Sequence, residues 1–171
     1  MKKIFLSFLF VFAALFSALA QLKHVKGISN AGITCGKTGN GDMFGIGFSH
    51  YFQPTWIWNV NAAYETGKVE STGLKQFFVG SGVDYTFFEA GEFLYFNAGL
   101  SLFAGLENLS SVEQNVEKIR NFTFGPSGNV NVELYFTAKL LFQIKAEQYY
   151  SPISKSGKWF PVYSLSLKYC F

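Results

Sequence analysis

The chain has 171 residues, of which 49% are hydrophobic and 19% aromatic, while only 15% are charged. This composition excludes an intrinsically disordered chain, which needs low hydrophobicity and a high net charge. It also argues against an ordinary soluble domain, in which about a quarter of the residues are charged. The length indicates a single domain, and the composition predicts a surface that faces lipid.

Residues 1–20 have the pattern of a secretory signal peptide. Two lysines form a basic start, residues 4–16 form an apolar stretch, and residues 18–20 (Ala-Leu-Ala) form a small-x-small cleavage site. An uncleaved membrane anchor is the alternative, but the apolar run is short for a stable span. We therefore expect export, cleavage after Ala20, and a mature domain over residues 21–171.

Removal of this segment lowers the formal net charge from +3 to +1, because it contains two lysines (3 − 2 = 1). The remaining lysines are scattered, so the sequence predicts no direct binding of nucleic acid, which needs a clustered basic face. After residue 20 no apolar run approaches the ~20 residues of a membrane helix. An apolar, exported chain of this kind is either a soluble β-sandwich or a β-barrel whose outer face contacts lipid.

A period of two residues decides between these alternatives. In residues 159–171 the odd positions include Tyr163 and Leu165, whereas the even positions include Ser164 and Ser166. Alternate residues of a strand point to opposite faces, so this strand has one face suited to lipid and one that is small and polar. The same alternation recurs along the chain, and the predicted strands are residues 27–36, 43–53, 56–65, 76–87, 93–105, 122–136, 140–150 and 159–171.

The first of these eight strands is rich in glycine, and its phase is unclear. Strands of roughly 9–11 residues cross a bilayer when tilted, and eight is the smallest even number in a membrane barrel. Sandwich strands are usually shorter, at about five or six residues. The sequence therefore predicts an all-β fold, an eight-stranded antiparallel up-and-down transmembrane β-barrel.

The connections alternate in length, as they do in outer-membrane barrels. Tight turns are predicted at residues 53–55, 89–91 and 136–138, and longer polar loops at residues 37–41, 67–73, 106–121 and 151–158. The longest loop includes a stretch that is compatible with a helical turn or two. Such loops have a role or are simply mobile, and both readings stay open for this one. Its candidate contact residues are Glu107, Glu113, Glu117, Lys118 and Arg120.

The inward faces predict a plugged interior rather than a solute pore, because side chains fill a barrel of eight strands. Charged residues inside it must be paired. If the turn at 137–139 pairs residue 136 with residue 140, Glu133 faces Gln143 and is a diagonal neighbour of Lys145. A proton or solute path is the alternative. The predicted interior polar network comprises Asp84, Asn129, Asn131, Glu133, Gln143, Lys145, Glu147 and Lys168.

Aromatic residues near the strand ends predict the interfacial girdles of a membrane protein. The girdle residues are Trp56, Trp58, Tyr149, Tyr150, Trp159, Tyr169 and Phe171.

Catalytic and metal-binding candidates are few. We expect His24 in an exposed start and His50 among the girdle residues. Ser49 and His50 are adjacent on a strand and point to opposite faces, so they do not form a nucleophile–base pair. The sequence offers no spacing for a metal site and no phosphate loop, so no cofactor is expected. A barrel also separates Cys35 from Cys170 beyond disulfide distance, whereas a sandwich would allow the bond.

Several segments resemble the TraO conjugal-transfer proteins of Bacteroides-type conjugative elements. The resemblance includes Gln21 followed by Lys-Gly-Ile at 26–28 and the segment 97–108. It is strongest from Phe122 to the end, including the pattern Pro-x-Tyr-x-Leu-x-Leu-Lys-Tyr-x-Phe at 161–171. The resemblance implies an outer-envelope component of a conjugative, type IV-like DNA-transfer apparatus, and it supplies no catalytic residues.

Three hypotheses for function follow. The first is a non-enzymatic outer-membrane barrel that serves conjugative transfer and contacts lipid and other proteins of the apparatus, without a small-molecule substrate. The second is a stand-alone small barrel, similar to OmpX or OmpA, for adhesion or envelope stability. The third is a barrel enzyme that acts on lipid, which needs a Ser, a His and an acid on one face, and the sequence does not assemble them.

Overall fold

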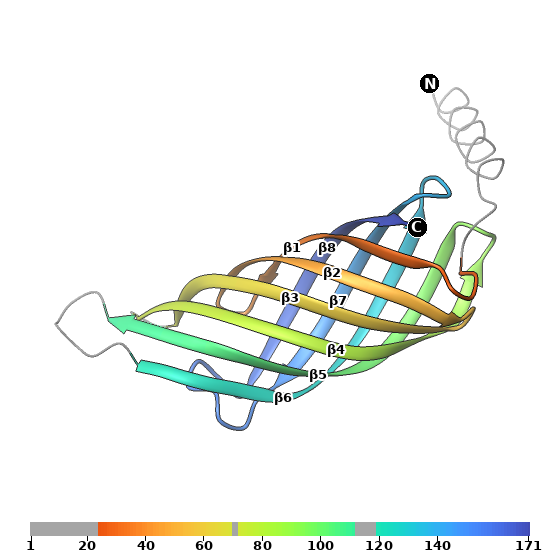
Figure 1. Ribbon diagram of the computed structural model, residues 1–171. Coiled ribbons are helices and arrows are strands. Elements are labelled where there is room, and N and C mark those ends of the chain that lie inside the picture. Colours follow the sequence, from red (N-terminus) through yellow and green to blue (C-terminus); the bar gives the residue numbers. More distant parts are fainter. Residues whose placement is uncertain (1–23, 70–71, 112–118) are drawn as a thin grey trace, which may run out of the picture.

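The computed structural model describes residues 24–69, 72–111 and 119–171, so the predicted signal peptide and its cleavage site lie outside the described residues. Eight strands form one closed barrel in which every strand pairs antiparallel with its sequence neighbours, and the last strand pairs with the first (Figure 1). This confirms the predicted fold class. The strands are β1 (Ser29–Thr38), β2 (Gly41–Gln53), β3 (Trp56–Val69), β4 (Thr72–Ala90), β5 (Leu94–Ser111), β6 (Ile119–Tyr135), β7 (Leu140–Tyr150) and β8 (Trp159–Cys170).

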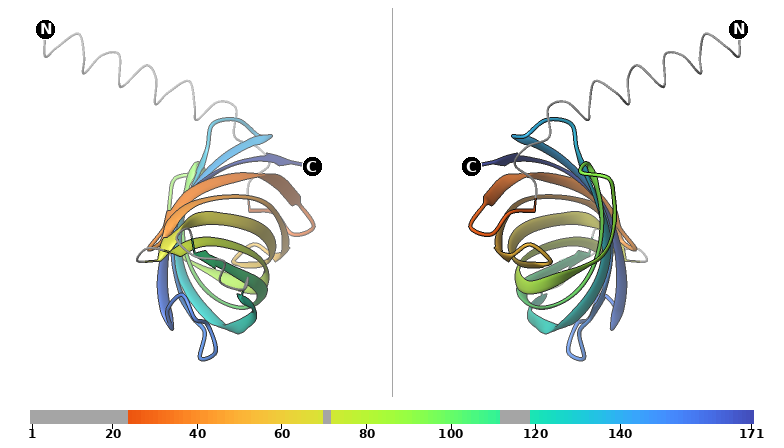
Figure 2. Two further views of the ribbon diagram at one scale, coloured as in Figure 1. Left: turned by 90° about the vertical axis from the view of Figure 1, so that its left-hand side faces the viewer. Right: turned by 90° about the vertical axis from the view of Figure 1, so that its right-hand side faces the viewer.

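The barrel has two different ends, which the views along it show from either side (Figure 2). At the short-turn end, residues 54–55, 91–93 and 136–139 join the strands, and the C-terminus lies there as well. At the opposite end, which we call the loop end, β1 joins β2 and β7 joins β8. Among the described residues, none forms a helix that is long and apolar enough to cross a membrane.

Three strands are much longer than a bilayer crossing requires. β4, β5 and β6 contain 19, 18 and 17 residues, whereas about 9–11 suffice to cross. At the loop end they extend beyond β1, β2, β7 and β8, and β3 accompanies β4 as far as the pair Val69↔Thr72 (Figure 1). The predicted loop at 106–121 is therefore wrong over most of its length, and the predicted stretch of helical turns falls largely on residues 112–118, outside the described residues.

The predicted loops at 37–41 and 67–73 are also wrong in length, since pairing continues to Lys37↔Asp42 and Val69↔Thr72. The physical reason is the same in each case. Polar residues appear on the outer face where a strand leaves lipid, but the backbone still satisfies its hydrogen bonds best by extending the ladder.

The outer wall is apolar over its middle and polar toward the loop end. Leu100 and Leu102 are 75% and 70% exposed, as expected for side chains of a wall that faces lipid. Around β3–β6 one outward row in the pairing register consists of Tyr64, Phe77, Leu106 and Phe122, and the next row toward the loop end consists of Thr66, Lys75, Asn108 and Arg120. The border between these rows marks where the wall leaves the membrane.

The interior contains two apolar layers with polar residues between them. Nearer the loop end, Tyr149 and Phe160 stack with ring centroids 5.0 Å apart, and Phe103 packs edge-on against Tyr149 at 4.8 Å. Nearer the short-turn end, a second layer comprises Tyr95, Tyr135, Leu141 and Cys170. These layers close the lumen on either side of the polar residues, one toward the loop end and one toward the short-turn end. The layer nearer the loop end, here called the aromatic layer, comprises Met43, Ala63, Phe78, Phe103, Tyr149, Phe160 and Val162.

Candidate functional site

The eight residues of the predicted polar network all come from inward-facing strand positions. Seven of them are buried, and Lys145 is half-buried. The predicted register is confirmed, since Glu133 pairs with Gln143 and Asn131 pairs with Lys145. The pairing of strand neighbours across a short turn was therefore readable from the sequence.

An amide cluster crosses the middle of the lumen. Asp84 on β4 accepts hydrogen bonds from the side-chain amides of Asn129 (3.0 Å) and Asn131 (2.9 Å) on β6. The Oδ1 atom of Asn131 accepts from Asn97 Nδ2 at 2.8 Å and from Gln143 Nε2 at 3.1 Å. Four strands are thus joined through one buried carboxylate and its amide donors, which offsets the cost of burying that charge.

The predicted proximity of Glu133 and Lys145 does not produce an ion pair. Lys145 Nζ lies 2.7 Å from Glu147 Oε2, two residues along the same strand and on the same face. The other oxygen of Glu147 accepts from Ser127 (2.7 Å) and Ser101 (3.1 Å). Glu147 therefore has both its charge and its second oxygen satisfied, and Lys145 is engaged away from Glu133.

Glu133 has a partner that the sequence did not reveal. His24, expected in an exposed start, is buried at the short-turn end, with Nε2 2.9 Å from Glu133 Oε2 and Nδ1 3.0 Å from the carbonyl of Pro54. Its ring stacks on Tyr95 at 3.7 Å with an interplanar angle of 7°. Tyr51 donates a second hydrogen bond to the same carboxylate at 2.8 Å. The expectation of an exposed His24 is therefore wrong.

The location of His24 has a physical reason. Tyr51 and Gln143 donate to Glu133 but are not basic. Lys145 is paired with Glu147, so a basic partner for Glu133 comes from elsewhere in the chain. The segment before β1 folds back to supply it, with His24 in the left-handed backbone region at φ 45°. No periodic pattern includes this residue, and because Lys145 on the same hairpin was the expected basic neighbour of Glu133, no sequence signal pointed to His24.

The space left inside the lumen is small. An internal cavity of about 50 Å³ is bordered by Asp84, Lys145, Glu147 and Lys168, and Lys168 Nζ donates to Ser49 Oγ at 3.1 Å. Sites for small molecules usually measure about 300–1,000 Å³, whereas this volume holds at most a few waters. The lumen between the two apolar layers is filled by side chains.

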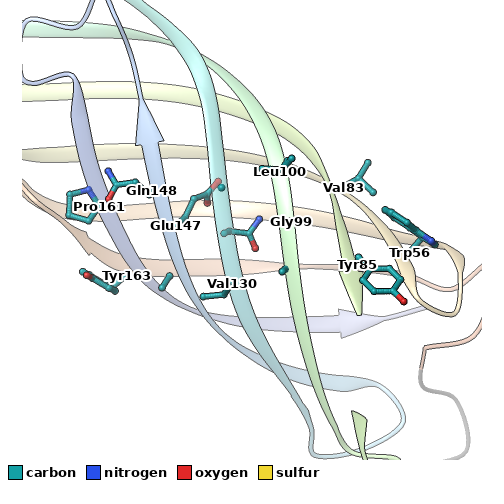
Figure 3. A pocket seen from close by; sticks show the side chains of 14 residues that line it. Trp56, Val83, Tyr85, Gly99, Leu100, Val130, Glu147, Gln148, Pro161 and Tyr163 are labelled. Carbon is teal, nitrogen blue, oxygen red and sulfur yellow. The ribbon is translucent and has the colours of Figure 1, made fainter. Parts of the chain in front are cut away.

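A larger hollow of about 920 Å³ lies on the outer wall (Figure 3). Small outward residues such as Ala98 and Gly128 form its base, and larger neighbours such as Tyr85, Leu100 and Tyr163 form its rim. Apart from Gln148 and the edges of inward residues, its walls are apolar. This depression belongs to the face that lipid chains cover.

The girdle prediction fails at Tyr149. Trp56, Trp58, Trp159, Tyr169 and Phe171 are exposed on the outer wall. Tyr150 is half-buried and packs on Trp159 with ring centroids 4.5 Å apart. Tyr149 is only 2% exposed and belongs to the aromatic layer. Adjacent strand residues face opposite sides, so with Tyr150 outside, Tyr149 must lie inside.

The predicted contact loop also needs correction. Glu107 is wholly buried on β5, where its Oε2 accepts from Ser154 Oγ (3.2 Å) and the Lys155 amide (3.3 Å). It is not a surface residue, because inward positions continue as far as the strand does. Arg120 on β6 is exposed. Glu113, Glu117 and Lys118 lie outside the described residues.

The remaining candidate chemical groups are separated. Cys35 is exposed and Cys170 is buried, and both are free thiols. Their partners on the β1–β8 ladder are Leu165 and Asn30 respectively, so they lie at different levels of the wall. His50 Nδ1 lies 2.9 Å from Ser29 Oγ. Within the described part of the chain, no three His, Cys, Asp or Glu residues form a group that could hold a metal ion.

A closed eight-stranded barrel with a lipid-suited outer wall and a filled interior defines the class of small outer-membrane-type β-barrels. Solved structures share this fold at low sequence identity, which shows the fold alone. The N-terminal barrel domain of Pseudomonas aeruginosa OprF is 10% identical, with a TM-score of 0.66 over 85% of this chain and 98% of that one. Neisserial surface protein A is 14% identical (TM-score 0.66, 84% and 96%), and Ail of Yersinia pestis is also 14% identical (0.59, 86% and 100%).

A search of the curated proteins found no match. The model of the family described as conjugative transposon protein TraO matches residues 22–171. The chain therefore belongs to the TraO family.

Proposed function

We propose that this protein is a non-enzymatic outer-membrane barrel in a conjugative, type IV-like DNA-transfer apparatus. The observation that carries the proposal is the TraO match over residues 22–171. The apolar outer wall supports a location in the outer-membrane lipid, which only closed barrels and helices can span. The proposal includes export with removal of residues 1–20, leaving a mature domain over residues 21–171, and sequencing the N-terminus of the purified protein tests this part.

The filled interior favours an anchoring role over conduction. A lumen with a cavity of about 50 Å³, covered by the aromatic layer, is too narrow among the described residues to pass DNA. Neither a cofactor nor a small-molecule substrate is part of the proposal. The barrel instead holds its loop end at a fixed place in the membrane, where other proteins of the apparatus can bind it.

The loop end is the contact surface that we favour, because the exposed charged side chains of its described residues are mainly basic. Lys75 and Arg120 lie on one outward row of β4–β6. Within the described residues, Asp42 is the exposed acid at this end, so a partner with an acidic surface fits best. The exposed basic residues there are Lys37, Lys68, Lys75, Arg120, Lys155 and Lys158.

Deletion of the gene in a donor strain tests the role, with mating frequency as the measurement. We expect the frequency to fall, to return with the wild-type gene, and to stay low with the charge reversal Lys75→Glu/Arg120→Glu. The matched control is Lys26→Glu/Lys139→Glu, which reverses two exposed charges at the short-turn end and should restore mating.

Outer-membrane fractionation must show equal amounts of each variant. If mating is unchanged by the deletion, the conjugation role is rejected while the barrel stands, and a stand-alone barrel for adhesion or envelope stability becomes the better reading. If both charge-reversal variants restore mating equally, the loop end is not the contact surface.

A further inference from the structure

Two buried carboxylates face the lumen on the loop-end side of the aromatic layer. Glu65 on β3 is 1% exposed and Glu107 on β5 is 0% exposed. Both pair in the register with Gln76 on the strand between them, so the three side chains belong to one inward row. This row lies at the level where the outer wall changes from Tyr64 to Thr66, at the border of the lipid-facing region.

Each carboxylate is satisfied on one oxygen only. Glu65 Oε1 accepts from the hydroxyl of Thr38, and Glu107 Oε2 accepts from Ser154 and from the amide of Lys155. Glu65 Oε2 and Glu107 Oε1 are buried and have no hydrogen-bond partner among the residues that the structure describes. The hydroxyl of Ser151, in the same β7–β8 connection as Ser154, is likewise buried without a partner. Three polar atoms at this end are therefore unsatisfied.

No basic side chain in the described part of the chain forms an ion pair with either carboxylate. The ion pairs of the described residues join His24 to Glu133, Lys37 to Asp42, and Lys145 to Glu147. The charges of Glu65 and Glu107 repel each other. An unpaired buried charge is strongly unfavourable. A group other than these side chains must therefore neutralise the Glu65 and Glu107 carboxylates. A proton and a cation are the two candidates.

We propose that Glu65 and Glu107 hold a hard divalent cation of the Ca²⁺ type. The donors at this level are oxygens, from the two carboxylates together with the Gln76 amide and nearby hydroxyls, and hard cations prefer such ligands. The described residues place no Cys or His in this row, which argues against a zinc-type site. Two carboxylates give modest charge, so the affinity should resemble that of extracellular calcium modules, with a Kd of about 10⁻⁴ to 10⁻³ M.

The site would add a link across the lumen to the β1–β8 ladder, which already joins Thr38 to Val162 along the wall at this end. Thr38 at the end of β1 contacts Glu65, and the β7–β8 connection contacts Glu107. A cation between the carboxylates links these two segments across β3–β5. It thereby fixes the β7–β8 connection, which carries Lys155 and Lys158, at the surface that partners would meet.

Thermal unfolding of the purified barrel in detergent micelles tests the site, in EDTA and then in millimolar Ca²⁺. We expect Ca²⁺ to raise the Tm of the wild type and to leave the Tm of Glu65→Gln/Glu107→Gln unchanged. The matched control is Asp42→Asn, which removes one carboxylate that is 57% exposed at the same end and should keep the wild-type shift. Terbium luminescence, displaced by Ca²⁺, gives a second measurement that needs only the wild-type protein.

The proposal is overturned if Ca²⁺ shifts the Tm of the wild type and the double variant equally, because the ion then binds elsewhere. It is overturned as well if the wild type shows neither a Ca²⁺-dependent Tm nor terbium luminescence that Ca²⁺ displaces. In that case, loss of wild-type stability at high pH, absent from the double variant, would identify a proton as the occupant. If the double variant does not fold, the terbium measurement on the wild type decides.

Discussion

Replacement of His24 by alanine should destabilise the barrel far more than its place before the first strand would imply. The substitution removes the hydrogen bond to Glu133 at 2.9 Å and the ring stacked on Tyr95 at 3.7 Å. A hydrogen bond to a charged group contributes about 1.5–3 kcal/mol, and an aromatic pair contributes about 0.5–1.5 kcal/mol beyond its buried area. The carboxylate keeps donors from Tyr51 and Gln143, so we expect a loss of about 2–3 kcal/mol, in the lower half of the summed range.

Urea unfolding in micelles, followed by tryptophan fluorescence, measures this loss. His50→Ala is the matched control, because His50 is half-exposed at the same end and makes one hydrogen bond to Ser29 at 2.9 Å. Its removal should cost about 0.5–1 kcal/mol. If the two alanine variants have equal unfolding free energies, the N-terminal segment is not held in the lumen as the structure has it.

A double-mutant cycle separates this interaction from general packing. His24→Ala and Glu133→Gln should couple by about 0.5–3 kcal/mol, as directly contacting residues do. If the losses of unfolding free energy in the two single variants simply add in the double variant, the hydrogen bond is refuted, even if each single variant is destabilised.

Two further substitutions test the interior packing. Gly99→Ala should lower the unfolding free energy by about 1–3 kcal/mol, because its Cβ would collide with Asp84 in the amide cluster. A Cβ at Gly128 would meet nothing closer than the Leu100 side chain at 3.7 Å, so equal urea midpoints for Gly99→Ala and Gly128→Ala would contradict this geometry. Tyr149→Ala should lower the unfolding free energy by about 3–5 kcal/mol, because it opens a cavity in the aromatic layer, and Tyr150→Ala should lower it much less. The reverse order would indicate that Tyr149 lies in the outer girdle after all.

The strand centres were predictable from the sequence because lipid and lumen impose opposite demands on alternate residues. For residues 163–167, one orientation of the strand places Tyr163, Leu165 and Leu167 toward lipid. The same orientation keeps the hydroxyls of Ser164 and Ser166 out of the lipid. The pairing of Glu133 with Gln143 followed from the short turn between β6 and β7. In these cases a local pattern and the membrane together leave little choice.

The strand ends were not predictable in the same way. Once a strand leaves lipid, its outer residues become polar, and the alternation that identifies it fades although the backbone pairing continues. Glu107 therefore looked like part of a loop but lies inside the barrel, and Lys68 and Thr72 lie on strands rather than in the loop predicted at 67–73. Tyr149 shows a related difficulty, because tyrosine suits both a girdle and an interior layer, and only the phase of the strand separates them.

His24 and Glu65 were missed for a third reason, which is that their environments are made by distant segments. His24 meets Glu133 across 109 residues, and Glu65 shares a row with Glu107 only through the intervening strand β4. Along the lumen, the short-turn end and the centre satisfy their buried charges with His24 and with amides and serines. The level beyond the aromatic layer leaves carboxylate oxygens without partners. Two buried carboxylates without counter-ions oppose folding, and the cation proposed between Glu65 and Glu107 would offset that cost.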